Sequence, residues 1–201
     1  MSPGISPALA PRVDAALAMA ARAHRNQVRK GTDVPYIVHP VSVAWILQRH
    51  GFDEDLVIAA ILHDTVEDTE LELATIRAAF GDGVAALVEA VTEKKVEAGV
   101  KRPWRVRKAE ALDHLIHAAD ERVAALKAAD LLHNLHSTVS ELKTCGATVW
   151  KRFNAPAADW IWYHRELGAQ ISARLGDHPL ARELDVAVAD LVATSAATAT
   201  G

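Results

Sequence analysis

Only one cysteine, Cys145, occurs in the sequence, which excludes disulfide bonds within the chain and is typical of a protein from a reducing compartment. No run of about eighteen or more apolar residues is present, so we expect no transmembrane helix. The β-branched alternation that indicates strands is almost absent, and so is a glycine-rich loop for binding phosphate. These absences leave a helical protein as the expected class.

Charges of the two signs nearly balance, because 22 basic residues stand against 26 acidic ones and the formal net charge is −4. A chain with this balance and a pI of about 6.2 has no general attraction to nucleic acid or to acidic membranes. Half of the 201 residues are apolar, which is enough to bury the core of one domain. We therefore expect a cytoplasmic protein of one domain, with no nucleic-acid or membrane partner.

Alanine is abundant, and apolar residues recur at helical spacing along most of the chain. We predict an all-α fold of roughly eight helices. Helical patterns cover residues 12–27, 40–51, 53–68, 72–81, 82–95, 105–119, 121–142, 159–175 and 179–193. The proline-containing residues 1–11 are expected to form a flexible leader and residues 194–201 a disordered tail, which leaves 12–193 as the domain.

The segment "LHDTVEDT" places charged groups directly after a strongly apolar run. His63 and Asp64 stand three to five residues before Glu67 and Asp68, so on one continuous helix these side chains share a face. An unpaired buried carboxylate is costly. The segment therefore needs either a bound metal ion or several basic partners.

Two further residues are candidate partners of this segment at a metal ion. His39 comes just before a predicted helix that begins at Pro40, and Asp130 lies in an apolar helical stretch. With His63 and Asp64 they offer two imidazoles and two carboxylates, a set suited to Mn²⁺, Fe²⁺, Zn²⁺ or Mg²⁺. A cation held there lowers the pKa of water and makes it a better nucleophile. The alternative is that these side chains are ordinary core residues with satisfied hydrogen bonds.

Three ordered stretches, "HRNQVRKGTDVPYIVHPVSVA", "AAILHDTVEDT" and "LKAADLLHNL", resemble motifs of the HD metal-dependent phosphohydrolases. More narrowly, they are similar to the hydrolase domain of RelA/SpoT-type stringent-response enzymes and to the stand-alone small alarmone hydrolases. The resemblance covers roughly residues 13–140. It implies a single HD-type helical domain with one Mn²⁺ ion, or another divalent ion, bound by His39, His63, Asp64 and Asp130.

The same resemblance implies roles for other residues. Glu67 and Asp68 would be the acid/base pair that orients and deprotonates the attacking water. Arg29 and Lys30 would line the nucleotide pocket, and Asn134, one helical turn after Asp130, would face the nucleotide. Further substrate contacts are expected from the basic residues around a polar interruption of the helical pattern, among them Lys94, Arg105 and Arg107.

The implied reaction is hydrolysis of the 3′-pyrophosphate of guanosine tetra- and pentaphosphate to GDP or GTP and pyrophosphate. The same chemistry on another phosphorylated nucleotide, such as an adenosine alarmone or the 2′-phosphate of NADPH, is an alternative, and a nucleotide sensor without activity is another. His24 is expected to support the site from behind rather than to bind metal. A second copy of the chain, as a homodimer, is a further candidate partner.

Overall fold

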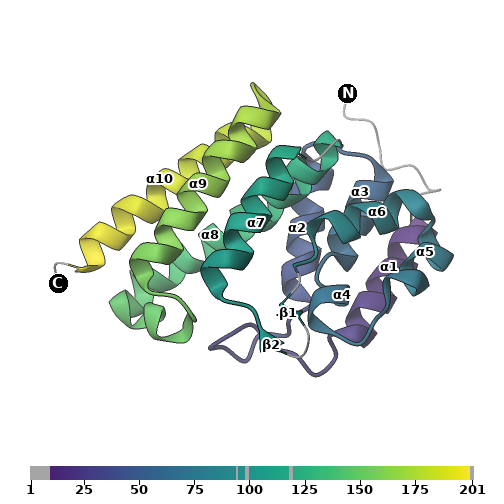
Figure 1. Cartoon of the computed structure of the whole chain (residues 1–201), viewed down its shortest axis with the longest axis horizontal. Coiled ribbons are helices and arrows are strands. Elements are labelled where there is room, and N and C mark those ends of the chain that lie inside the picture. Colours follow the sequence, from purple (N-terminus) through teal and green to yellow (C-terminus); the bar gives the residue numbers. More distant parts are fainter. Residues whose placement is uncertain (1–9, 94, 98–99, 118–119, 200–201) are drawn as a thin grey trace. The chain divides into compact units, whose positions relative to one another are not determined.

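The computed structural model describes residues 10–93, 95–97, 100–117 and 120–199, and helices dominate these ranges (Figure 1). This confirms the predicted all-α class. The chain forms two compact units, residues 1–92 and 93–201, here called the N-terminal unit and the C-terminal unit. Over the described ranges, no helix combines the length and the hydropathy needed to cross a membrane.

The N-terminal unit is built around α3 (Glu54–Leu62), which is buried from Leu56 to Leu62. The Asp53 side chain caps this helix by accepting a hydrogen bond from the backbone N–H of Leu56 at 2.9 Å. Such an all-apolar helix must be covered on every side. The helices that pack against it are α1 (Ala10–Ala23), α2 (Val38–Arg49) and α6 (Asp82–Val91), and α5 (Leu73–Phe80) packs against α6.

The predicted continuous helix over 53–68 is wrong at its centre. α3 ends at Leu62, and the short helix α4 (Thr65–Asp68) begins after a turn at His63 and Asp64. The Thr65 hydroxyl donates to the Leu62 carbonyl at 2.7 Å, a local bond that competes with the regular helical pattern. The acidic segment is therefore divided between a turn and a helix instead of lying along one helix face.

The C-terminal unit begins with a small antiparallel hairpin, β1 (Val96–Glu97) and β2 (Val100–Lys101), in the predicted polar interruption. Its helices are α7 (Trp104–His117), α8 (Glu121–Cys145), the 3₁₀ helix η1 (Gly146–Arg152), α9 (Ala157–Leu175) and α10 (Pro179–Ala199). α8 packs against α9 and α10, and α9 also packs against α7. Gly168 lets α9 and α10 approach closely, because a Cβ atom there would lie 2.9 Å from Cγ2 of Val188.

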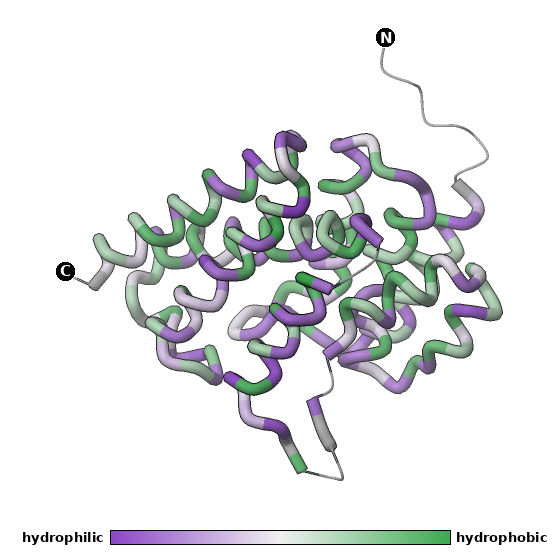
Figure 2. Tube along the Cα trace, turned by 45° about the horizontal axis from the view of Figure 1, so that its top comes forward, coloured by the Kyte–Doolittle hydropathy of each residue, from purple (hydrophilic) through white to green (hydrophobic). Residues whose placement is uncertain are grey.

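Both ends of the helical region differ from expectation where they are described. α1 begins at Ala10, inside the predicted leader, and α10 continues to Ala199, so the predicted tail is wrong for residues 194–199. Thr194 and Ser195 are buried, and the Thr198 hydroxyl donates to the Thr194 carbonyl at 3.1 Å. Apolar residues recur along α10 as along the other helices (Figure 2). Residues 1–9 and 200–201 lie outside the described residues.

Candidate functional site

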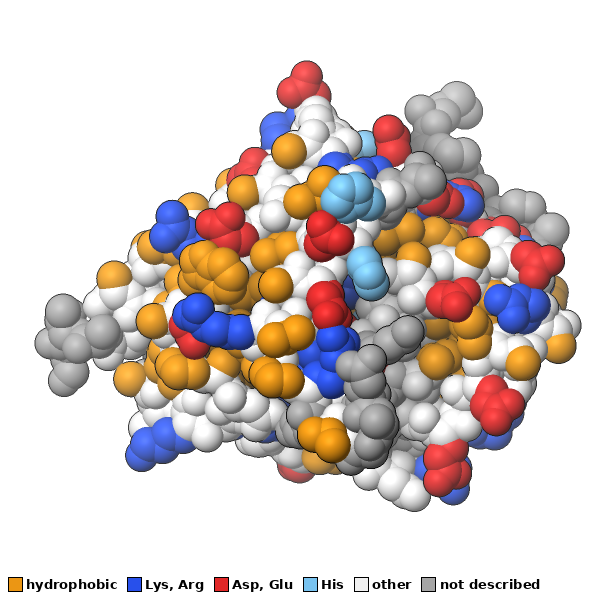
Figure 3. Space-filling model, in the orientation of Figure 1, with side chains coloured by type: hydrophobic (Ala, Val, Ile, Leu, Met, Phe, Trp, Pro, Cys, Tyr) orange, Lys and Arg blue, Asp and Glu red, His pale blue; other side chains and the backbone are white. Residues whose placement is uncertain are grey.

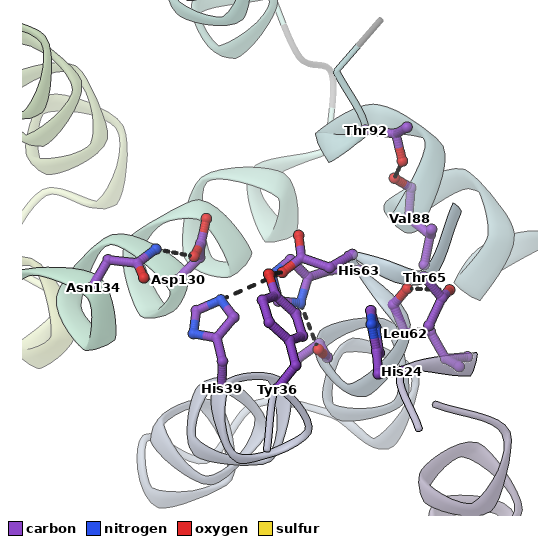
Figure 4. A network of polar contacts seen from close by, with 12 residues as sticks. His24, Tyr36, His39, Leu62, His63, Thr65, Val88, Thr92, Asp130 and Asn134 are labelled. Carbon is purple, nitrogen blue, oxygen red and sulfur yellow. Dashed lines mark hydrogen bonds and ion pairs between the residues drawn. The ribbon is translucent and has the colours of Figure 1, made fainter. Parts of the chain in front are cut away.

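His39 is positioned by the start of α2. The helix begins at Val38, and Pro40 falls in its first turn, where the missing N–H of proline costs no helical hydrogen bond. His39 is only 1% exposed, so its imidazole is fixed within the N-terminal unit. Its ring centroid lies 5.2 Å from that of His63. Figure 4 shows Tyr36, His39 and His63 pointing toward one another.

His63 has a defined orientation and tautomer. Its Nδ1 lies 2.7 Å from the Ala60 carbonyl oxygen, which can only accept a hydrogen bond, so Nδ1 carries the proton. Nε2 is then the nitrogen with the lone pair, as a metal ligand requires. His63 Nε2 lies 3.1 Å from Oδ2 of Asp64, and His39 Nε2 lies 3.5 Å from the same oxygen.

Asp64 is ionised in this environment. Burial alone would raise the pKa of its carboxyl, but the positive charge that the neighbouring imidazoles of His63 and His39 carry when protonated, together with the hydrogen bond from the Tyr36 hydroxyl, lowers it well below its usual range. Two imidazole nitrogens therefore face one carboxylate oxygen. This donor set fits a divalent cation of borderline or hard character, as the sequence predicts.

Asp130, the fourth predicted ligand, lies on α8 in the C-terminal unit and is half-buried. The Nδ2 group of Asn134 donates to Asp130 Oδ1 at 2.7 Å, as drawn in Figure 4. This confirms that the two side chains share one helix face.

Glu67 and Asp68 lie on α4 and are half-buried. The α4 segment is tied to the turn after α1, because Gln27 Nε2 donates to the backbone carbonyl of Asp68 at 2.7 Å. Gln27 Oε1 in turn accepts from His24 Nδ1 at 2.7 Å. His24, 2% exposed, is thus connected to the acidic segment through Gln27.

Tyr36 and Gln27 are site residues that sequence reasoning did not single out. The Tyr36 hydroxyl donates to Asp64 Oδ2 at 2.6 Å, and its ring packs against that of His24 with centroids 4.8 Å apart. Both residues stand inside the first quoted motif, "HRNQVRKGTDVPYIVHPVSVA", beside residues that were selected. Their positions within this motif could have indicated a role at the site, although the sequence does not reveal which residues they contact.

Arg29 and Lys30 lie in the loop between α1 and α2. The Arg29 guanidinium carbon sits 5.7 Å from the Tyr36 ring centroid, a cation–π geometry, and the Arg29 backbone N–H donates to the Val34 carbonyl at 2.8 Å. Lys30 is exposed. Arg29 is thus brought next to a residue that contacts Asp64, whereas Lys30 stays on the surface of the loop.

The predicted basic contacts of the C-terminal unit form ion pairs. Arg107 NH1 lies 2.7 Å from Glu93, and both side chains are largely buried. Lys108 pairs with the same carboxylate, and Arg105 pairs with Asp159. Lys94 lies outside the described residues. On the face drawn in Figure 3, basic and acidic side chains are interspersed.

Comparison with known proteins adds an independent observation. The HD domain family model matches residues 16–156. The chain is 42% identical over 129 residues to GTP pyrophosphokinase of Streptomyces coelicolor, covering 63% of this chain and 14% of that protein. It is 37% identical over 134 residues to guanosine-3′,5′-bis(diphosphate) 3′-pyrophosphohydrolase MESH1 of Danio rerio, covering 65% of this chain and 69% of that protein. The chain thus spans about a seventh of the length of the first of these relatives.

Two solved structures are similar over most of their length. One, described as a metazoan orthologue of SpoT that hydrolyses ppGpp, has a TM-score of 0.69 and 26% identity, covering 89% of this chain and 94% of that chain. The other, a protein from Listeria monocytogenes, has a TM-score of 0.65 and 36% identity, covering 75% of this chain and 96% of that chain.

Proposed function

The chain belongs to the HD-domain family, and we propose that it hydrolyses the 3′-pyrophosphate of guanosine tetra- and pentaphosphate, releasing GDP or GTP and pyrophosphate. The observation that carries the proposal is the meeting of two buried imidazole nitrogens at the ionised carboxylate of Asp64. The named activities of the relatives supply the substrate class.

Membership of the family implies a divalent metal ion, and the N/O donor set of the N-terminal unit fits one. We propose Mn²⁺ as the ion and His39, His63, Asp64 and Asp130 as its ligands. When bound, the cation supplies Lewis-acid polarisation of the phosphate and a lower pKa for water. The chain's own contribution is to hold His63 as the Nδ1–H tautomer and Asp64 as the anion.

Glu67 and Asp68 are proposed as the acid/base pair. A carboxylate within reach of the attacking water accepts its proton, and proton transfer of this kind contributes about 10²–10⁴ in rate. The hydrogen bond from Gln27 to the Asp68 backbone holds the segment that carries both groups. The water oxygen forms a bond to the phosphorus attached to the ribose 3′ oxygen, the bond between that phosphorus and the 3′ oxygen breaks, and the 3′ oxygen takes up a proton, so that pyrophosphate leaves and a 3′-hydroxyl remains.

Substrate contacts are proposed for several basic side chains and one amide. Arg29 and Lys30 provide positive charge in the loop between α1 and α2, and charge of this sign stabilises the phosphate as negative charge develops. Asn134 offers an amide beside Asp130. The remaining proposed contacts are Lys94, Arg105 and Arg107. For Arg105 and Arg107 to reach phosphate, the substrate must compete with Asp159 and Glu93.

The activity is tested by measuring pyrophosphate and phosphate release after metal is stripped and Mn²⁺ is added back. The substrates are guanosine tetraphosphate, its adenosine counterpart, NADPH and a simple nucleoside triphosphate. We expect pyrophosphate release from the guanosine compound, reduced about 100-fold or more in Glu67→Gln. The exposed neighbour Glu70 provides the matched control, Glu70→Gln, which keeps parent activity.

The other possible results of this assay each favour one of the alternative functions. Turnover of only the adenosine compound or NADPH keeps the chemistry and changes the substrate. Binding of Mn²⁺ and nucleotide without turnover favours the sensor. We further propose that the protein is cytoplasmic and that it forms a homodimer. Sedimentation of the purified chain tests the homodimer.

A further inference from the structure

The hydroxyl of Tyr36 contacts the carboxylate at the centre of the candidate metal site. It donates to Asp64 Oδ2 at 2.6 Å, a length typical of a strong hydrogen bond to an anion. We propose that Tyr36 is a positioning residue that orients Asp64 for the divalent cation. The inference rests on the proposed function and assigns a role to a residue outside the predicted ligand and acid/base sets.

The hydrogen bond from Tyr36 is made to the Asp64 oxygen that also faces the two imidazoles. Oδ2 is the atom that lies 3.1 Å from His63 Nε2 and 3.5 Å from His39 Nε2. The terminal torsion of an aspartate is broad and roughly two-fold, so a carboxylate without a fixed partner samples a range of orientations. The Tyr36 hydroxyl restricts that rotation and keeps one oxygen directed toward both imidazoles. Asp64 is thereby arranged as a ligand before the cation arrives.

The Tyr36 ring is itself held by contacts that do not involve its hydroxyl. His24 packs against it at a centroid distance of 4.8 Å, His39 meets it edge-on at 5.9 Å, and the Arg29 guanidinium lies over it. Its backbone N–H donates to the Gln27 carbonyl at 2.9 Å. A phenylalanine would preserve the ring and the backbone bond. Tyr36→Phe therefore removes the Asp64 hydrogen bond while leaving these ring contacts in place.

Metal affinity is the readout that separates positioning from a general structural role. Mn²⁺ is titrated into the metal-free full chain, and free Mn²⁺ is followed by electron paramagnetic resonance. We expect Tyr36→Phe to bind Mn²⁺ about tenfold or more weakly than the parent, the usual cost of losing a hydrogen-bond partner of a metal ligand. At Mn²⁺ concentrations that saturate the variant, kcat and KM for the nucleotide return to parent values.

The other tyrosine of the chain, Tyr163, provides a chemically identical control. Tyr163→Phe removes the same group from α9 and should bind Mn²⁺ like the parent. A second measurement uses Asp64→Glu, whose longer side chain moves the carboxylate away from the hydroxyl. If Tyr36 acts through Asp64, adding Tyr36→Phe to Asp64→Glu causes a smaller further loss of affinity than Tyr36→Phe causes alone.

The outcomes distinguish this inference from the proposed function. Equal Mn²⁺ affinity of the parent and Tyr36→Phe overturns the inference and leaves the proposed function standing. Equal losses in the two tyrosine variants, or full additivity with Asp64→Glu, also overturn it. A parent chain that binds no divalent cation overturns the proposed function and the inference together.

Discussion

Several polar side chains of the candidate site use one atom for a short hydrogen bond within the protein, and this bond fixes the direction of a second polar atom. His63 donates from Nδ1 to Ala60, which directs Nε2 toward Asp64. Asn134 donates to Oδ1 of Asp130, which restricts the rotation of that carboxylate. Such partners fix rotamer and tautomer together, and that is the arrangement a metal or phosphate site needs before its ligand binds.

His164 in α9 supports a prediction about pH. Burial lowers the pKa of its imidazole to about 4, although Nδ1 donates to the Trp160 carbonyl at 2.6 Å and the rings stack. An unfolded histidine titrates near 6.5. Between these values the unfolded chain binds more protons than the folded one, so the free energy of unfolding falls as pH drops from about 6.5 to about 4.

Replacing this histidine should remove that dependence. Urea unfolding of the parent and of His164→Gln, measured at several pH values from 7 to 4, should show a stability difference that shrinks as the pH is lowered. The exposed His117, changed to Gln, is the control and should follow the parent curve. A His164→Gln curve parallel to that of the parent would contradict the prediction.

The short helix α4 is held in place by a hydrogen bond from a residue outside it. α4 has only four residues, too few for a stable isolated helix, and it carries both proposed acid/base groups. Its end is fastened by Gln27, which connects the Asp68 backbone to His24. The placement of Glu67 and Asp68 therefore depends on the Gln27 side chain, which is outside the proposed ligand and acid/base sets.

Gln27→Glu replaces the donating amide with a carboxylate of the same shape and should release α4. We expect kcat to fall about tenfold or more, because displacement of catalytic groups by about 1 Å can cost up to about 10² in rate. Mn²⁺ affinity should stay near that of the parent, since Tyr36 and the histidines remain in place. Steady-state kinetics and the Mn²⁺ titration check the two halves of this prediction.

The exposed Gln48 on α2 allows a control with the same change of charge. Gln48→Glu should leave both kcat and metal affinity unchanged. A Gln27→Glu variant with parent kcat would show that α4 is held by its packing alone.

For the whole molecule, a cation that binds only the folded chain must stabilise it. At a free Mn²⁺ concentration of about 100 times Kd, linkage predicts about 2.7 kcal/mol of added stability. Thermal unfolding should therefore shift upward with Mn²⁺ and return to the metal-free value with a chelator. Asp130→Asn tests the fourth proposed ligand, and we expect most of the Mn²⁺-dependent shift to disappear.

Asp113, an exposed aspartate on α7, is the corresponding control. Asp113→Asn should keep the full shift with Mn²⁺. If Asp130→Asn also keeps it, Asp130 is not a ligand, and the proposed set reduces to the three residues of the N-terminal unit.

Properties that depend on local spacing were accessible from the sequence. Helical periodicity predicted the all-α class, because the pattern of apolar residues along a helix is set within a few turns. The spacing of Asp130 and Asn134 predicted a shared helix face, and their hydrogen bond confirms it. The motifs also indicated the family, since each keeps its chemical groups in one short stretch.

Contacts between residues far apart in the sequence could be identified only from the tertiary structure. The break after Leu62 depends on the local bond of Thr65 within a buried segment, which apolar periodicity does not reveal. Tyr36 reaches Asp64 across 28 residues of sequence, and Gln27 reaches Asp68 across 41. Glu93 forms ion pairs with both Arg107 and Lys108, which the sequence presents simply as part of a basic cluster. Periodicity records which face of a helix is buried, whereas the partner of a polar atom is determined by the packing of the loop or helix that carries it.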